Sequence, residues 1–355
     1  MLWRFGKNVL SLTKLGDLPA QQRKIIRGWC MYDWANSGFA ASGVAAIFPV
    51  YFVLLFKSTL GEEGNLLGLT VTASSSWSLG IGISTAVVAL SSPILGVIAD
   101  RVAIKKALLA IYVCAGSVFI VLGFFCVYTS NPPLWLFGTF VLGNIGFAGS
   151  LVFYNSFLPH IAPRNLLDDG SSRGFAYGYV GGGLLLTIHL AIILIVSGTE
   201  FEDLITRLSI ASIGLWWFGW SLWTLKVVPE PVIINPIARL KVNNALILAI
   251  KELNRTLSEL TSYKVIVIYL MAYLLFNDGI QTIMGLAGAF AADTLGVSLE
   301  FNMATILIIQ FIAAIGAMGF SRLSTLITTK NALVIALIGW SPVSYTHLRA
   351  HETRH

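Results

Sequence analysis

Long apolar stretches, separated by short charged segments, dominate this chain. A membrane-spanning helix needs about 20 apolar residues, and eight stretches are long enough: 29–56, 77–99, 107–128, 134–157, 175–197, 209–228, 264–290 and 302–320. A ninth begins near Asn331 and loses its apolar character after Trp340. A soluble domain carries about 25% charged residues, whereas this chain carries 11%. The sequence therefore predicts an all-α polytopic membrane protein whose outer solvent is lipid.

Lysines and arginines favour one side of this predicted array. Strict alternation of the spans puts 19 of the 23 Lys and Arg residues in the N-terminal segment and every second connection. The opposite connections hold only Lys57 and Arg207. Short loops rich in Lys and Arg stay on the cytoplasmic side. We therefore predict a multi-pass protein with a cytoplasmic N-terminus, in the inner membrane if the source is prokaryotic.

The spacing of the stretches divides the chain into two unequal groups. The longest interior connection, 229–263, begins Pro-Glu-Pro and continues as a charged amphipathic stretch. We expect a cytoplasmic segment at 1–28, a six-helix transmembrane bundle at 29–228, a cytoplasmic linker at 229–263, and a partial second bundle at 264–340. This organisation is typical of two-bundle transporters.

The end of the chain does not continue the ninth stretch. Residues 341–355 hold three of the five histidines and two arginines where about ten more apolar residues would complete a span. This run resembles the translation of a sequencing adapter, and we expect it to be non-native. A metal-binding histidine tail is the alternative.

Several functional classes do not fit this pattern. The net charge of +6 lies in loops and forms no basic face on a soluble domain, so no nucleic-acid partner is expected. Cys30, Cys114 and Cys126 lack metal-ligand spacing, and no HExxH or Ser/His pair occurs in a span. We expect no enzyme, no cofactor and no metal; the oligomeric state stays open.

The connection between the second and third spans carries a recognisable signature. It reads Gly96-Val-Ile-Ala-Asp100-Arg101-Val-Ala-Ile-Lys105-Lys106 and resembles the corresponding loop of the major facilitator superfamily. The resemblance implies that Gly96 permits a close helix contact, that Asp100 caps a helix and pairs between bundles, and that the basic residues anchor the loop. Ala103 and Ile104 depart from the family pattern. An ordinary capped turn is the alternative.

Four further motifs are similar to the vacuole-effluxer-like branch of that superfamily. They are Tyr32-Asp-Trp-Ala-Asn-Ser-Gly38 with Phe48-Pro-Val-Tyr-Phe52, Tyr154-Asn-Ser-Phe-Leu-Pro-His160, Ser172–Gly182, and Ala272–Ile283. The founding members of the branch are autophagy-related amino acid exporters of fungal vacuoles. The resemblance implies a major facilitator fold with a six-helix N-terminal bundle and an incomplete C-terminal bundle.

Glycines recur every four residues at the start of the fifth span. Gly174, Gly178 and Gly182 share one helix face, and small residues let helix backbones approach closely in lipid. We expect helix packing at this stripe; sliding against a partner helix during gating is a hypothesis.

Ionisable and amide side chains inside a span are costly and usually face the bundle interior. Asp33, His189 and Asp278 are the ionisable residues well inside the spans. Asp33 has an alternative role as a charge near a helix start, and His189 as a structural hydrogen-bonding group. The predicted substrate and coupling residues are Asp33, Asn36, His189, Asn277, Asp278 and Gln281.

The leading functional hypothesis is a secondary active transporter. It would move small polar solutes, with amino acids or related metabolites as the expected class, by alternating access of two bundles about a central site. Proton coupling through Asp278 is a further hypothesis. The alternatives are a non-transporting membrane receptor or scaffold, and an inactive transporter fragment.

Overall fold

A computed structural model describes residues 15–66, 68–232, 242–260 and 262–339. The predicted non-native tail therefore lies outside the described residues. In chain order the elements are η1 (Leu15–Asp17), α2 (Ala20–Gly38), η2 (Phe39–Ile47), α3 (Phe48–Leu60), β1 (Gly64–Leu66), β2 (Leu69–Val71), α4 (Ala73–Arg101), α5 (Lys105–Leu122), η3 (Gly123–Tyr128), α6 (Pro132–Ile161), η4 (Arg164–Leu166), α7 (Leu167–Val196), α8 (Glu202–Val227), α9 (Val242–Leu260), α10 (Lys264–Thr294) and α11 (Leu299–Ile327).

Within the described ranges, seven helices are long and apolar enough to cross a membrane. They are Ala20–Leu60, Ala73–Arg101, Lys105–Tyr128, Pro132–Ile161, Arg164–Val196, Lys264–Thr294 and Leu299–Ser324. The sixth predicted span, 209–228, lies in α8, which has 26 residues but is not among these seven. Its serines, threonines and tryptophans make it less apolar, yet α8 packs lengthwise against α2 and α5. The prediction of an all-α polytopic protein is confirmed.

The first span is longer than the sequence predicted. It runs without a break through α2, η2 and α3 and begins at Ala20, nine residues before the predicted start at residue 29. At 1.5 Å per residue its 41 residues reach about 60 Å, twice the roughly 30 Å of a hydrocarbon core. The polar first turns of α2 therefore extend beyond the lipid region.

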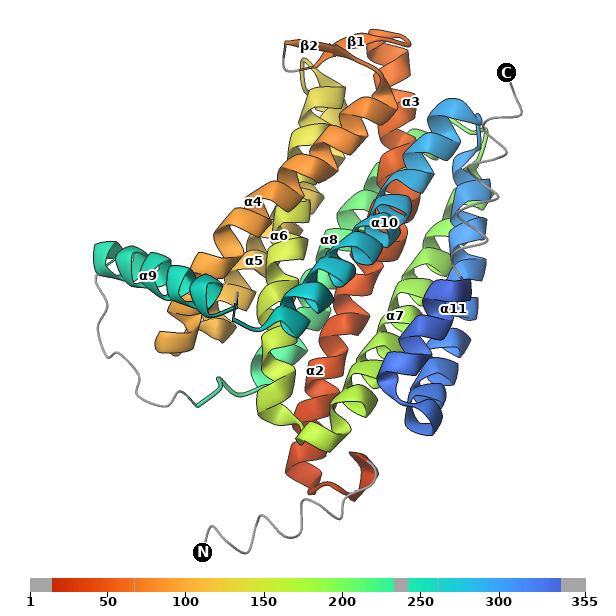
Figure 1. Ribbon diagram of the computed structural model, residues 1–355. Coiled ribbons are helices and arrows are strands. Elements are labelled where there is room, and N and C mark those ends of the chain that lie inside the picture. Colours follow the sequence, from red (N-terminus) through yellow and green to blue (C-terminus); the bar gives the residue numbers. More distant parts are fainter. Residues whose placement is uncertain (1–14, 67, 233–241, 261, 340–355) are drawn as a thin grey trace, which may run out of the picture.

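The helices form two sets around this first span. We call α2, η2, α3 and α4 to α8 the six-helix group. The second set consists of α10 and α11. Figure 1 shows the first span running through the middle of the molecule, with α10 and α11 along one side and α9 lying crosswise at the left, beside the lower part of α4. Within the predicted linker, the amphipathic stretch forms α9, which packs against α4 and α10. The chain continues after α11 as a short apolar helix, Thr329–Gly339, where the ninth stretch was expected.

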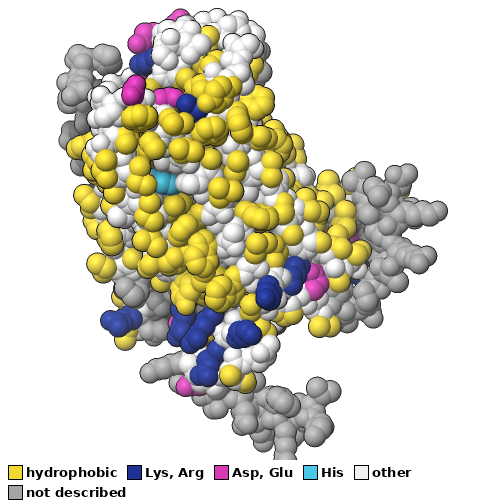
Figure 2. All heavy atoms as spheres, turned by 180° about the vertical axis from the view of Figure 1, so that it is seen from behind, with side chains coloured by type: hydrophobic (Ala, Val, Ile, Leu, Met, Phe, Trp, Pro, Cys, Tyr) yellow, Lys and Arg dark blue, Asp and Glu magenta, His cyan; other side chains and the backbone are white. Residues whose placement is uncertain are grey.

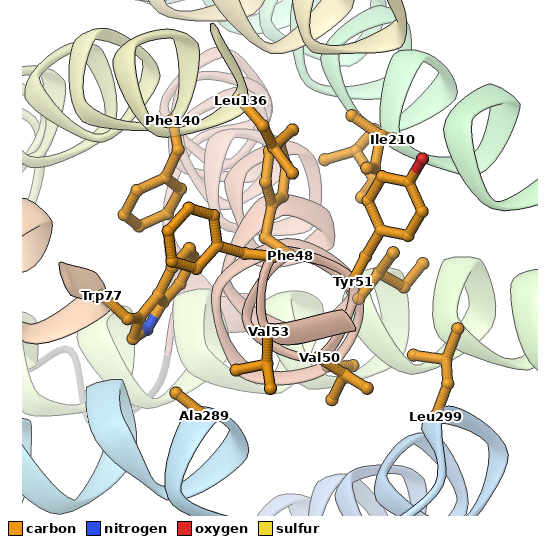
Figure 3. Close-up of a cluster of buried hydrophobic side chains, with 14 of the residues drawn as sticks. Phe48, Val50, Tyr51, Val53, Trp77, Leu136, Phe140, Ile210, Ala289 and Leu299 are labelled. Atoms are coloured by element: carbon orange, nitrogen blue, oxygen red, sulfur yellow. The ribbon is translucent and has the colours of Figure 1, made fainter. Parts of the chain in front are cut away.

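The largest cluster of buried side chains surrounds α3. Figure 3 shows Val50 and Val53 directed toward Leu299 and Ala289, while Phe48 lies toward Phe140. The rings of Phe48 and Phe140 lie 5.5 Å apart. The cluster joins the six-helix group to α10 and α11, and α11 also packs extensively on α7.

Between α3 and α4 lies a short hairpin that the all-α prediction did not include. Its strands β1 and β2 pair antiparallel, with Gly64 opposite Val71 and Leu66 opposite Leu69. Gly68 adopts φ +85°, a conformation that favours glycine, and its N–H donates to Asn65. We call this end of the molecule the hairpin end.

The opposite end, which we call the basic end, carries half of the described Lys and Arg residues, at the starts of α2 and α7 and between α4 and α5. They are Arg23, Lys24, Arg27, Arg101, Lys105, Lys106, Arg164 and Arg173. Figure 2 shows Lys and Arg side chains gathered low on the rear face, below a largely hydrophobic surface. The predicted charge asymmetry is present in the folded chain.

Candidate functional site

Asp33 lies in a cluster of aromatic and hydroxyl side chains between α2 and α6. The Tyr154 hydroxyl donates to Asp33 Oδ2 at 2.7 Å. The Tyr154 ring stacks on Trp29 at 4.5 Å, and Trp29 Nε1 donates to the Tyr154 carbonyl at 3.0 Å. Tyr32 lies against the same ring and donates to Ser150 at 2.5 Å. We call these residues the Asp33 cluster.

The glycine stripe of α7 completes the surroundings of this cluster. A Cβ at Gly174 would collide with the Asp33 carboxylate, and one at Gly178 would lie 2.5 Å from Ser37 Oγ. At Gly182 a Cβ would lie 2.6 Å from the Ser37 carbonyl oxygen. The absence of side chains at these positions lets α7 lie directly on α2, and it leaves room for the carboxylate. The stripe predicted from the sequence packs against α2.

The Asp33 cluster can bind a proton or a cationic group. Among the described residues, Asp33 has one hydrogen-bond partner, the neutral Tyr154 hydroxyl, and no ion pair. A carboxylate inside a helical bundle is costly without a charge partner. It is therefore suited to receive a proton or an ammonium group that enters the bundle.

The cluster continues into an irregular part of the first span. Asn36 is buried, its Oδ1 accepts a hydrogen bond from Ser37, and its Nδ2 has no partner among the described residues. Three residues later the chain enters η2, a π-helix of nine residues. Such segments inside α-helices occur frequently at functional sites. Asn302 of α11 donates to the carbonyls of Ala45 and Ala46 at 3.1 Å each, so the second set of helices contacts η2 directly.

His189 does not join the Asp33 cluster. It is buried between α7 and α8, where its Nε2 lies 2.8 Å from Ser212 Oγ. Its Nδ1 has no hydrogen-bond partner among the described residues. The structure thus places His189 apart from Asp33, with its face of α7 on α8, and its role in transport stays a prediction. Ser197, directly after α7, donates instead to Glu300 of α11.

The candidates on α10 lie apart from the cluster as well. Asn277 is half-buried, and Asp278 and Gln281 are exposed. In α10, all of which the structure describes, the buried residues are Gly288 and Ala289, close to the hairpin end. The described chain thus brings Asp33 and Asn36 together and leaves Asn277, Asp278 and Gln281 on a separate surface.

The signature loop between α4 and α5 is anchored differently from what the resemblance implied. Asp100 pairs with Lys105 of its own loop at 2.7 Å. The N–H groups of Lys105 and Lys106 donate to the carboxylate of Glu230, at 2.7 and 2.8 Å. Glu230 of the Pro-Glu-Pro segment, rather than Asp100, therefore caps α5.

Two other positions of this loop also differ from the expectation. Arg101 pairs with Glu252 of α9 at 2.7 Å, so a loop residue contacts the linker. A Cβ at Gly96 would have open space within 4 Å. The close helix contact implied at Gly96 is not found in the described part of the chain, because α4 packs on α6, α9 and α10 through other residues.

At the hairpin end, a charged contact fastens α10 to the six-helix group. Lys57 Nζ lies 2.8 Å from Asp293 Oδ1 and also contacts the exposed Glu62. The backbone N–H and the hydroxyl of Ser74, at the start of α4, both donate to Asp293 Oδ2. Trp77 Nε1 donates to the Gly285 carbonyl at 3.0 Å. Asp293 thus holds α3 and α4 against α10.

Sequence reasoning missed several of these partners. Tyr154 belongs to one of the four family motifs, and Glu230 lies between two prolines. No local sequence pattern indicates that Tyr154 contacts Asp33 or that Glu230 contacts the start of α5. Within the described ranges, no three His, Cys, Asp or Glu side chains lie close enough to hold a metal ion.

Comparison with known proteins identifies a family that this chain resembles. The sequence model of the family described as vacuole effluxer Atg22 like matches residues 21–169 and 165–345. YxiO of Bacillus subtilis (strain 168), an uncharacterized MFS-type transporter, is 28% identical over 315 residues, which cover 87% of this chain and 70% of that protein. Autophagy-related protein 22-1 of Penicillium rubens is 23% identical over 442 residues, which cover 93% and 72%. These matches confirm the resemblance that the four motifs predicted.

Among solved structures, the xylose transporter XylE from E. coli, in a partially occluded inward-open conformation, is similar to this chain. The TM-score is 0.48 at 13% sequence identity, and the match covers 86% of this chain and 73% of that one.

Proposed function

Because the chain belongs to the vacuole effluxer Atg22-like family and is similar to an MFS-type transporter, we propose that it is a secondary active transporter of small polar solutes. Amino acids or related metabolites are the proposed substrate class. The observation that carries the proposal is the convergence of three family motifs, on α2, α6 and α7, around the Asp33 carboxylate.

The proposed substrate contact is the Asp33 carboxylate. An amino acid carries an ammonium group, and Asp33 is a carboxylate whose one hydrogen-bond partner among the described residues is a neutral hydroxyl. Charge-assisted hydrogen bonds are about twice as strong as neutral ones, so an ammonium group would compete with Tyr154 for Asp33. Asn36, with an unpartnered Nδ2, lies one turn away on the same helix and would donate a hydrogen bond to the substrate carboxylate.

Proton coupling is proposed to use a second carboxylate, Asp278. It lies on α10, outside the Asp33 cluster, and its side chain is exposed. If substrate and proton bind at separate sites, a substitution at one site can change gradient-driven uptake without changing exchange. The proposed membrane is the inner membrane if the source is prokaryotic, with the basic end in the cytoplasm because Lys and Arg favour that side.

Flux measurements in proteoliposomes test this function. The source DNA is resequenced through the codons after Trp340, and the reading frame so defined is expressed and reconstituted. Uptake of each of the 20 standard radiolabelled amino acids is measured by counterflow exchange and under an imposed pH gradient. We expect exchange of at least one amino acid above protein-free vesicles. Absence of flux for the whole panel, with the protein folded in the vesicles, would support a receptor or scaffold instead.

Two variants separate the roles of the carboxylates. Asp33→Asn is expected to reduce exchange and driven uptake together, by more than tenfold, because the ammonium loses its charge partner. Asp278→Asn is expected to abolish gradient-driven uptake while leaving exchange intact. Glu62→Gln, in the exposed hairpin region, is the matched control for loss of one acidic charge. Unchanged driven uptake in Asp278→Asn would rule out the coupling role.

A further inference from the structure

A cavity lies at the basic end, on the side of α2 away from α6. Its volume is about 290 Å³, and it is formed where η1 folds against the first turns of α2 and α7. The lining residues are Leu15, Gly16, Arg23, Ile26, Arg27, Cys30, Arg173 and Tyr177. None of these residues belongs to the proposed transport site, although α2 and α7 also frame the Asp33 carboxylate.

Three arginines from two helices give this cavity a strong positive charge. Arg23 is held in place by a 2.7 Å hydrogen bond to the Gly16 carbonyl. Arg173 is held by Asp169, which lies one helical turn before it. Arg27 has no hydrogen bond or ion pair within the part of the chain that the structure describes. Since Asp169 offsets one charge, the lining keeps a net positive charge and a free guanidinium, whose forked donors match phosphate oxygens.

The surface next to the cavity is apolar and exposed. On α7, Arg173, Tyr177, Val180 and Leu184 follow each other at helical spacing on one face. Val180 is 56% exposed and Leu184 is 45% exposed, as expected for side chains that contact lipid tails. On α2, Arg27 and Trp34 lie on one face of the helix, seven residues apart. The Trp34 ring stacks on Trp216 of α8.

This arrangement favours a ligand with an anionic head and apolar chains. A free anion would use only the arginines, whereas a phospholipid would also cover Val180 and Leu184. Figure 2 shows the same combination on the rear face, with Lys and Arg side chains directly below a hydrophobic surface.

We propose that the cavity between the first turns of α2 and α7 binds the phosphate headgroup of an anionic phospholipid. Basic pockets between membrane-spanning helices recognise such headgroups. Arg27 contacts the phosphate, Arg23 and Arg173 flank it, and the acyl chains lie along Val180 and Leu184. The bound lipid joins α2 to α7, the two helices that also frame the Asp33 carboxylate.

Thermal unfolding of the full chain, purified in a neutral detergent, tests this site. Phosphatidylglycerol, phosphatidylcholine and inorganic phosphate are each added over a concentration series. We expect phosphatidylglycerol to raise Tm and phosphatidylcholine at the same mole ratio to raise it much less. Arg27→Gln, whose side chain has no described partner to lose, is expected to weaken the apparent affinity for phosphatidylglycerol at least fivefold. Lys24→Gln removes one charge from the same turn of α2 and is expected to leave the affinity unchanged.

Native mass spectrometry gives a second measurement on the same samples. The wild type and Lys24→Gln are expected to retain phosphatidylglycerol at collision energies at which Arg27→Gln releases it. Equal retention by all three proteins would overturn the proposal. An equal rise in Tm with inorganic phosphate alone would also overturn it, because the site would then be one for a free anion.

Discussion

The six-helix group and the two long helices after the linker are packed in different ways. α6 buries residues along its whole length, from Pro133 to Ile161, whereas α10 buries Gly288 and Ala289 near the hairpin end. α10 meets the six-helix group at α3, α4 and η2, through Gly288 and Asp293, whereas α11 packs extensively on α7 as well as on η2. α6 is thus held by contacts along its whole length, whereas α10 is held by contacts near one end. This difference indicates where substitutions should be tolerated.

The largest expected effect concerns close packing inside the six-helix group. Gly182→Leu would force a side chain into the backbone of Ser37 and separate α7 from α2. Overpacking costs about 1–3 kcal/mol and occasionally more, and we expect a loss near the upper limit because backbone cannot move aside. Gly279→Leu on α10, where a Cβ meets open space, is the matched control with little loss. Unfolding in sodium dodecyl sulfate measures both, and equal losses would show that the two regions are packed alike.

A smaller effect is expected at the contact that joins the two sets. Asp293→Ala removes the Lys57 ion pair and both hydrogen bonds from Ser74. Hydrogen bonds to charged groups contribute about 1.5–3 kcal/mol, so we expect a loss of that size in the same unfolding assay. Glu62 is the other partner of Lys57, and the Glu62 side chain is 82% exposed. Glu62→Ala should therefore reduce stability much less than Asp293→Ala does. Similar losses in the two variants would mean that Asp293 does not hold α10 in place.

The smallest effect is expected at the linker. Arg101 and Glu252 have side chains that are 42% and 27% exposed, and exposed ion pairs contribute about 0.2–1 kcal/mol. Arg101→Gln should therefore change stability within that range, and the change should disappear at high salt because screening already weakens the pair. A loss that persists at high salt would show that α9 is bound to α4 more tightly than an exposed pair allows.

Much of the fold followed from local patterns. Seven of the eight predicted spans coincide with helices that are long and apolar enough to cross a membrane, since hydrophobic length needs no knowledge of neighbouring helices. The glycine stripe was also predictable, because spacing by four places residues on one face. The sixth span was identified as a helix, although its serines and tryptophans reduce its apolar character.

The candidate site was predictable only in part. Asp33 and Asn36 were identified because polar side chains are rare inside spans. Their partner Tyr154, and the pairing of His189 with Ser212, depend on which faces of distant helices meet. The contact of Glu230 with the start of α5 likewise depends on tertiary packing, since the two residues that form it are 125 positions apart.

The sequence by itself determined the positions and approximate limits of the long apolar helices, the charge asymmetry between the two ends, and the family motifs. Each depends on the composition of a continuous segment. The tertiary structure alone decided how each helix is rotated about its axis, and therefore that Asp33 meets Tyr154, that Asp293 joins α10 to α4, and that three arginines share one cavity. In lipid, helix rotation is set by close packing and hydrogen bonds between helices rather than by hydrophobicity, and a single segment does not carry that information.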